Sequence, residues 1–383
     1  MGQLSPHSST PFSEIDLARN IQKLANLLLI LISITLPLVA ADIVLKALKL
    51  PRNASRTMLL SGGDLSSGRE GFRRYPSHRN LEQSAIYDRS IAYRYAYASN
   101  NLGLISWPDI GKGQPVDLAI AGDSYAEGQG GFAWIKQWQQ QTLRPRGLLS
   151  INYAIAGSGF EDFAVAARNA RTQHHAQRLL VLFIEHDAYR PYQPMASNGR
   201  CSFYSNGDLD RLPAPLVCSL YGVVWHHVPP GLSNAQLIQE SLNRQHYGLI
   251  PALNQLLQHA SRPKSAKQTL LQQQAATQTR RFGPIPAASR AALQRIKALY
   301  GPANVLLVQL PDRPGQQAST GFGEHLQTIT GLTVHNLAAR CPLSKDQFHR
   351  LDNHPNSSGY RKLQTCVAND PVIRRFVLQA EGH

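Results

Sequence analysis

The sequence predicts an α/β fold in which helices cover both faces of a parallel β-sheet, preceded by one N-terminal transmembrane helix. Short apolar segments alternate with helical patterns from about residue 85 onward, an order typical of parallel sheets. One of these segments, residues 178–184, is too apolar for a strand with one face in water. Residues 24–45 are apolar except for Asp42 and are long enough to cross a bilayer.

The N-terminal part is expected to tether the protein to a membrane. Residues 1–23 are expected to form a cytoplasmic tail, residues 24–45 a signal anchor, and residues 46–84 a basic linker. A cleaved signal peptide is the alternative, with the small residues Val39 and Ala41 before the cut. The length of the apolar segment and the hydrophilic tail before it favour the anchor. More Lys and Arg residues follow the segment than precede it, which taken alone would place the larger domain in the cytoplasm.

Cysteine usage indicates the opposite orientation. Four cysteines fall into two local pairs, Cys201 with Cys218 and Cys341 with Cys366, and each pair brackets a loop-like segment. This spacing is expected for disulfides formed in an oxidising compartment, and no Cys-x-x-Cys or Cys/His spacing suggests zinc. Four unrelated buried thiols are the alternative. The cysteines therefore favour a single-pass protein of the inner (cytoplasmic) membrane whose larger domain is extracytoplasmic, in the periplasm.

The strands and helices of the larger domain follow one another along the chain. The predicted strands cover residues 115–121, 148–154, 178–184, 304–310 and 333–337. The predicted helices cover residues 131–141, 161–172, 287–300 and 357–368. Residues 190–284 interrupt this alternation and contain a Gln- and Leu-rich part that looks helical, so we expect an insertion over the sheet. Residues 371–383 are expected to form a C-terminal tail.

A serine follows the first predicted strand of the sheet directly. Gly122, Asp123 and Ser124 lie where this strand ends and a helix is about to begin. Open α/β sheets bind their ligands at the carboxyl ends of the strands, and a glycine there leaves room for the backbone. The position predicts that Ser124 is an exposed nucleophile and that Asp123 shapes the turn.

The next two strands end in polar or small residues at the same edge of the sheet. Gly157 follows the strand at 148–154, and its amide is expected to face the same oxyanion as the amide of Ser124. A strand-to-helix turn that simply needs small residues is the alternative. His186 follows the strand at 178–184 and can donate to an oxyanion, whereas Asp187 cannot unless it is protonated.

A histidine with a nearby carboxylate lies near the C-terminus. Asp352 comes two positions before His354, in a loop that leads into the last helix, and Ser357 can cap that helix. A serine at neutral pH is a poor nucleophile without such a base, so Ser124, His354 and Asp352 are predicted to form a triad. Asp346 and His349 form a rival pair.

These blocks, taken in order, resemble the SGNH, or GDSL, hydrolase superfamily over residues 85–370. The resemblance implies a three-layer α/β/α, flavodoxin-like fold, Ser124 as nucleophile, and an oxyanion hole made by the amides of Ser124 and Gly157 with a third donor. His186 stands where the family usually has asparagine, which puts the third donor in doubt. His354 matches the family's last block better than His349, because a family-like run follows it: Pro355, Asn356, Gly359 and Tyr360.

The net charge of the chain indicates which classes of partner it could bind. The formal net charge is +15, which suits nucleic acid, anionic lipid or acidic polysaccharide. No run of Lys and Arg interleaved with aromatics and no RNA-binding signature is present, so nucleic acid is not an expected partner. Two histidine pairs, His174 with His175 and His226 with His227, lack carboxylates or cysteines at ligand spacing and are expected at the surface. Neither a metal nor a cofactor is expected.

The sequence therefore predicts a membrane-tethered, extracytoplasmic serine esterase or O-acyltransferase. Resemblance to membrane-anchored bacterial members of the family implies that its substrate is an acylated, and above all O-acetylated, carbohydrate of the cell surface. A lipase or thioesterase of the same fold is one alternative. A catalytically impaired glycan-binding scaffold is another alternative. The strongest reason for it is that His186 stands where the family usually has asparagine.

Overall fold

The computed structural model describes residues 14–47, 56–63, 65–67, 72–87, 89–190, 201–202, 223–244, 285–312 and 320–378. The chain divides into two compact units, one of residues 1–53 with 246–271 and one of residues 54–245 with 272–383. In the first unit the described residues form one helix, and the second unit contains the sheets.

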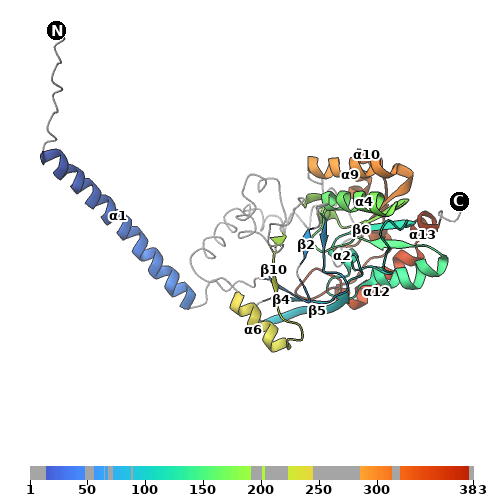
Figure 1. The fold of residues 1–383 in the computed structure, drawn as a ribbon, viewed down its shortest axis with the longest axis horizontal. Coiled ribbons are helices and arrows are strands. Elements are labelled where there is room, and N and C mark those ends of the chain that lie inside the picture. The colour runs from blue at the N-terminus through green and yellow to red at the C-terminus, as the bar shows by residue number, and fades with distance from the viewer. Residues whose placement is uncertain are drawn as a thin grey trace, which may run out of the picture. The chain divides into compact units, whose positions relative to one another are not determined.

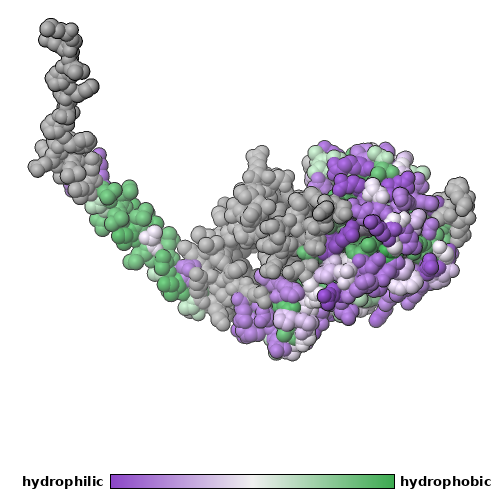
Figure 2. Space-filling model, viewed as in Figure 1, coloured by the Kyte–Doolittle hydropathy of each residue, from purple (hydrophilic) through white to green (hydrophobic). Residues whose placement is uncertain are grey.

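Helix α1 (Glu14–Ala47) contains an apolar stretch, Gln22–Leu45, that has no buried part (Figure 2). Its hydroxyl groups are satisfied within the helix, because Ser33 and Thr35 each donate to the backbone carbonyl four residues earlier. Internal satisfaction matters in a bilayer, since lipid chains offer no hydrogen-bond partner. The helix is long and apolar enough to cross a membrane, as a signal sequence or as a retained anchor.

The second unit is built around a five-stranded, all-parallel sheet with the strand order β12-β11-β8-β6-β7. Its strands are β6 (Leu118–Gly122), β7 (Ser150–Asn152), β8 (Arg178–Phe183), β11 (Val305–Gln309) and β12 (Thr333–Asn336). Each lies within or overlaps a segment that the sequence predicts as a strand. The predicted α/β fold with a parallel sheet is therefore confirmed.

Side chains of these strands alternate between two hydrophobic cores. In β6, Ala119 and Ala121 belong to one core and Leu118 and Ile120 to the other, as the two-residue repeat of a strand requires. Both faces are covered by helices, with α4 and α9 on one side and α12 on the other (Figure 1). The covering helices are α4 (Phe160–His174), α9 (Ala287–Tyr300), α3 (Trp134–Trp138), α12 (Ser357–Asn369) and α13 (Pro371–Leu378). The result is a three-layer α/β/α arrangement.

A second sheet, which the sequence did not reveal, combines strands that precede the parallel sheet along the chain with strands from the insertion after β8. Its strand order is β5-β4-β1-β10-β9. Its strands are β1 (Arg56–Ser61), β4 (Asn80–Tyr87), β5 (Ser90–Ala98), β9 (Cys201–Ser202) and β10 (Val223–His227), and a two-stranded ribbon of β2 (Ser66–Ser67) and β3 (Arg73–Arg74) lies between β1 and β4 in sequence.

The expectation of a linker at residues 46–84 is wrong for β1 and for the part of β4 that falls within it. The side chains of Met58, Leu60 and Leu81 are buried in the core that also contains Ala119. The apolar run of β1 is only a few residues long, and one of its two neighbours in the sheet is β10, far along the chain. Such pairing leaves no local periodicity to recognise.

The insertion expected at residues 190–284 is described in part. It contributes strands β9 and β10, which pair with each other, and helix α6 (Asn234–Arg244). Strand β10 also pairs in parallel with β1. The expectation of a helical insertion therefore misses both strands. Residues 191–200, 203–222 and 245–284 lie outside the described residues.

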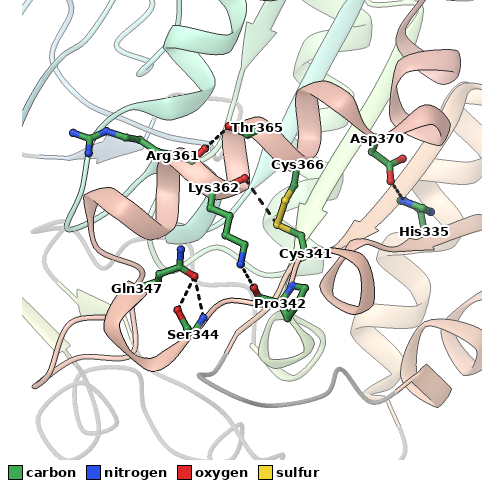
Figure 3. The surroundings of a disulfide bond; sticks show 10 residues. All are labelled: His335, Cys341, Pro342, Ser344, Gln347, Arg361, Lys362, Thr365, Cys366 and Asp370. Atoms are coloured by element: carbon green, nitrogen blue, oxygen red, sulfur yellow. Dashed lines mark hydrogen bonds and ion pairs between the residues drawn. A yellow bond between two sulfur atoms is a disulfide. The ribbon is translucent and has the colours of Figure 1, made fainter.

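The C-terminal region contains one of the two predicted disulfides. Cys341 and Cys366 are bonded, with their Cα atoms 6.1 Å apart (Figure 3). The bond joins the residue after helix α11 (Leu337–Arg340) to the last turn of α12. Cys218 lies outside the described residues, so its pairing with Cys201 stays a prediction.

Helix α13 replaces the start of the expected tail at 371–383. Its residues Ile373 and Phe376 are buried against the parallel sheet's second core. Asp370 caps the helix, because its Oδ1 accepts hydrogen bonds from the amides of Val372 and Ile373 at 2.9 and 3.1 Å. Residues 371–378 therefore form a packed and capped helix rather than a tail.

Candidate active site

Ser124 lies where strand β6 meets the short helix α2 (Ser124–Glu127). Asp123 caps this helix through its Oδ1, which accepts a hydrogen bond from the amide of Tyr125 at 2.9 Å. A side chain at Gly122 would place its Cβ 2.8 Å from the carbonyl of Leu182 in the neighbouring strand, so the turn requires glycine. The predicted roles of Asp123 and Gly122 in shaping the turn are confirmed.

His354 brings its imidazole to this serine. Its Nε2 lies 2.8 Å from the Oγ of Ser124, and its Nδ1 is hydrogen-bonded to Oδ1 of Asp352. The same carboxylate oxygen accepts the backbone amide of His354 at 3.0 Å. Since a carboxylate accepts, Nδ1 is the donor, which leaves Nε2 free to accept the serine proton. The three residues that the sequence predicts as a triad thus form one hydrogen-bonded line.

The rings of two tyrosines enclose the imidazole of His354. Its centroid lies 5.4 Å from that of Tyr125 and 6.1 Å from that of Tyr93. His354 and Ser124 are 8% and 3% exposed, so the pair is largely shielded from water. The expectation of an exposed Ser124 is therefore wrong, because the loop that carries His354 covers it. Helix α12 follows this loop. Its cap is Asn356 and not the predicted Ser357, because Oδ1 of Asn356 accepts hydrogen bonds from the amides of Ser358 and Gly359 at 3.0 and 3.1 Å.

The rival pair is not assembled. The Nε2 of His349 lies 2.8 Å from the carbonyl oxygen of Gly130, and Asp346 is exposed. Because the carbonyl only accepts, Nε2 of His349 carries the proton and cannot act as a base toward a serine. Burial also lowers the pKa of His349, which favours its neutral form.

The amides predicted for an oxyanion hole are both available. Within the described part of the chain, the backbone amides of Ser124 and Gly157 donate no hydrogen bond. Gly157 has a positive φ of 79°, which a residue with a side chain adopts only with strain. His186 is exposed on the turn after β8, so its role as third donor stays a prediction, whereas its neighbour Asp187 is fully buried.

A buried arginine that the sequence did not single out connects these turns. Nη1 of Arg190 lies 3.1 Å from Oδ2 of Asp123 and 2.9 Å from Oδ1 of Asp187, and it donates to the carbonyl of Ser158 at 2.8 Å. Burial and the neighbouring charge of Asp123 raise the pKa of Asp187 well above its usual value. One cation therefore holds the turns after three strands together.

A buried glutamate also lies beside the site. Oε1 of Glu127 accepts the hydroxyls of Tyr75 and Tyr95 at 2.9 and 3.0 Å, and Oε2 accepts the amide of Ala156. Burial raises the pKa of Glu127 to about 7. Nothing in the local sequence distinguishes this glutamate from an ordinary helix residue, because its partners come from distant segments.

The two histidine pairs, His174 with His175 and His226 with His227, form no metal-ligand set among the described residues. His174, the last residue of α4, is 3% exposed, so the expectation that it lies at the surface is wrong. His227 is exposed. Among the described residues, no group of three or more His, Cys, Asp or Glu side chains is arranged to hold a metal ion.

Comparison with known proteins gives matches among solved structures alone. No protein-family model matches the sequence, and no curated protein matches it. The lipase/acylhydrolase from Enterococcus faecalis matches with a TM-score of 0.32 and 11% identity, over 66% of this chain and 94% of that chain. A catalytic mutant of an acetylxylan esterase from Geobacillus stearothermophilus gives 0.33 and 9%, over 69% and 95%.

A GDSL-like lipase from Bacteroides thetaiotaomicron matches with a TM-score of 0.27 and 11% identity, over 66% of this chain and 88% of that chain. The solved structures similar to this chain over about two thirds of its length are thus GDSL, or SGNH, lipases and esterases, at low sequence identity.

Proposed function

We propose that this protein is a serine esterase or O-acyltransferase that acts on ester groups through Ser124, His354 and Asp352. The observation that carries the proposal is the line of hydrogen bonds from Ser124 through His354 to Asp352. A hydroxyl, an imidazole in the accepting tautomer and a buried carboxylate are the parts that acyl transfer needs. They come from segments 230 residues apart, so local sequence does not force them together.

In the first half of the reaction, Ser124 becomes acylated. Its Oγ forms a bond to the carbonyl carbon of the ester while Nε2 of His354 takes the hydroxyl proton. Asp352 stabilises the resulting imidazolium without taking the proton. The tetrahedral intermediate then breaks its bond to the alcohol oxygen, and the imidazolium returns the proton to that alcohol as it leaves.

The second half releases the acyl group. A water molecule, or a hydroxyl of an acceptor sugar, gives a proton to His354 and attacks the acyl carbon, and Ser124 leaves with the proton restored. In both halves the amides of Ser124 and Gly157 are the donors for the oxyanion. The identity of the attacking hydroxyl decides between esterase and transferase.

The substrate that we propose is an O-acetylated carbohydrate of the cell surface, reached from the outer side of the inner membrane. The apolar helix α1 supports attachment to a membrane, and the Cys341–Cys366 disulfide supports an oxidising compartment. The net charge of +15 suits an anionic glycan. Alkaline phosphatase is active only after export, so a fusion of this enzyme to the C-terminus should be active. An inactive fusion would contradict this location.

Hydrolysis of p-nitrophenyl acetate by the full-length protein in detergent tests the reaction. Ser124→Ala should lower kcat at least about 1000-fold, because the nucleophile is lost. Ser150→Ala is the matched control: its hydroxyl is also buried but accepts from Gln139 at 3.2 Å. Activity that survives Ser124→Ala contradicts the proposal. Acetylated polysaccharide with a labelled sugar acceptor then distinguishes release of acetate from transfer.

A further inference from the structure

We propose that Arg73 is a positioning residue that orients the amide of Gly157 toward the oxyanion. Glu127 assists it by holding the N–H of Ala156, in the peptide unit before this one. This inference rests on the proposed function, since it concerns the oxyanion hole of that reaction. Arg73 belongs to the ribbon strand β3, within the segment that the sequence presents as a linker. It therefore gives the N-terminal segment a part in the chemistry.

Arg73 acts on the peptide unit between Ala156 and Gly157. A trans peptide is planar, so its carbonyl oxygen and its N–H point in opposite directions. Nη1 of Arg73 donates to the carbonyl oxygen of Ala156 at 3.1 Å. Holding that oxygen therefore fixes the direction of the Gly157 N–H on the other side of the same peptide.

The guanidinium selects one of two orientations of this peptide. If the peptide turned over, the N–H of Gly157 would face the guanidinium, and two donors would meet in a buried space. Gly157 is a glycine with a positive φ, so its own side-chain sterics do little to prevent such a rotation. The selection therefore has to come from outside the loop, and Arg73 supplies it.

Arg73 is itself held in place. It is 5% exposed, its Nη2 donates to the hydroxyl of Ser158 at 2.9 Å, and the same nitrogen lies 3.7 Å from Asp162 at the start of α4. A guanidinium has its donors in a rigid fork, so two contacts on either side of Gly157 fix both its position and its angle. The loop is gripped at residues 156 and 158 by one side chain.

Glu127 holds the peptide before this one. Its Oε2 accepts the N–H of Ala156, while Tyr75 and Tyr95 donate to its Oε1. Burial raises the pKa of Glu127, and the positive charge of Arg73 partly offsets this. Arg73 therefore stabilises the ionised form of Glu127. The N–H and the C=O of Ala156 are thus both engaged by buried charged groups, and the next N–H, that of Gly157, is left for the substrate.

Arg73→Met in the full-length protein tests this role. The expected result is a fall in kcat of about 100-fold, the scale of losing one oxyanion donor, with KM changed less than about twofold. Arg73→Lys keeps the charge but not the fork and should lose about tenfold. Arg94→Met is the matched control, because Arg94 makes a similar paired contact with Glu82, at 2.8 and 3.0 Å, in the same N-terminal segment.

A thionoester analogue of the substrate supplies a readout that a merely structural role would not move. Sulfur is larger than oxygen and accepts hydrogen bonds poorly, so an intact oxyanion hole strongly prefers the ester. Arg73→Met should lower the ratio of ester to thionoester kcat/KM at least about tenfold, while the unfolding temperature of Arg73→Lys stays near that of wild type. A ratio unchanged in both variants overturns the inference.

The failure of this inference and of the proposed function are distinguishable. If Ser124→Ala abolishes hydrolysis while Arg73→Met and Arg73→Lys keep the wild-type kcat, the function stands and the positioning role is wrong. If both substrates slow by the same factor, Arg73 supports the fold and not the oxyanion, and the inference is again wrong. If Ser124→Ala hydrolyses the ester at the wild-type rate, both proposals are wrong.

Discussion

Tyr87 donates a hydrogen bond to Asp352, with its hydroxyl oxygen 3.0 Å from Oδ2 of the carboxylate. The other carboxylate oxygen faces His354, so the hydroxyl fixes the plane in which the carboxylate meets the imidazole. Tyr87 ends strand β4 of the second sheet, 265 residues before Asp352. The N-terminal segment therefore contacts both ends of the candidate site, through Tyr87 at one end and Arg73 at the other.

Removing this hydroxyl should slow the reaction without unfolding the protein. Tyr87→Phe is expected to lower kcat about tenfold, because a hydrogen bond to a charged group contributes about 1.5 kcal/mol or more. Stopped assays with p-nitrophenyl acetate measure the effect. Tyr300→Phe is the control, since its hydroxyl donates to the carbonyl of Ala167 at 3.0 Å in the packing of α9 on α4. Equal kcat values for wild type and Tyr87→Phe would contradict the role of Tyr87.

Alanine substitution of each histidine near the C-terminus distinguishes which of the two is the base. His354→Ala should lower kcat about 1000-fold or more, since it removes the proposed base. His349→Ala should lower kcat less than about tenfold, because it removes contacts with the carbonyl of Gly130 and the ring of Tyr93 but none with Ser124. Each variant serves as the control for the other. A larger loss for His349→Ala would exchange the two assignments.

Glu127 should make the stability of the protein depend on pH in a defined direction. Its pKa is raised from 4.5 to about 7, so between these values the folded protein binds a proton that the unfolded chain has released. Its contribution is fully present below the unfolded pKa and is lost as the pH rises through the folded pKa, with a total of about 3 kcal/mol.

Urea unfolding of wild type and Glu127→Gln measures this contribution. The difference in unfolding free energy should move by about 3 kcal/mol in favour of the variant from about pH 4 to about pH 8. Asp162 and Asp187, whose pKa values are also raised by burial, are present in both proteins and cancel in the difference. A difference that does not change with pH would show that Glu127 does not titrate in this range.

The disulfide should stabilise the C-terminal region by closing a loop. Cys341 and Cys366 are 25 residues apart, and a cross-link of this span is expected to stabilise the fold by about 3 kcal/mol. Cys341→Ser and Cys366→Ser together should therefore lower the unfolding free energy by about that amount, measured with urea under non-reducing conditions. An unchanged midpoint would mean that the bond does not form in the expressed protein.

The sequence was sufficient where the signal is local. The parallel sheet follows from uniformly apolar runs such as residues 178–184, whose side chains divide between two cores. The position of Ser124 follows from a strand that ends in Gly-Asp-Ser, because strand ends of a parallel sheet share one edge. The preference for His354 over His349 came from the residues that follow His354, and the ring contacts agree with it, because Nε2 of His354 lies at Ser124 whereas that of His349 lies at the carbonyl of Gly130.

The sequence was insufficient where polar partners come from distant segments. The sequence predicted no role in the site for Arg73, Tyr87, Glu127 or Arg190, because each acquires its role from the group that it meets in the folded chain. Strand β1 escaped notice for a related reason, because β10, one of its partners, lies in the insertion. Local periodicity reports which side of an element is buried but not what a charged side chain will find there.

The separation of Ser124 and His354 along the chain also bears on when activity can arise. The pair spans 230 residues, and the bond from Tyr87 to Asp352 spans 265. Contacts of such range form late in folding, after the ends of a long intervening loop have been brought together. A chain in which these distant segments have not yet met therefore holds Ser124 without a base, and the proposed chemistry begins only when folding brings His354 to it.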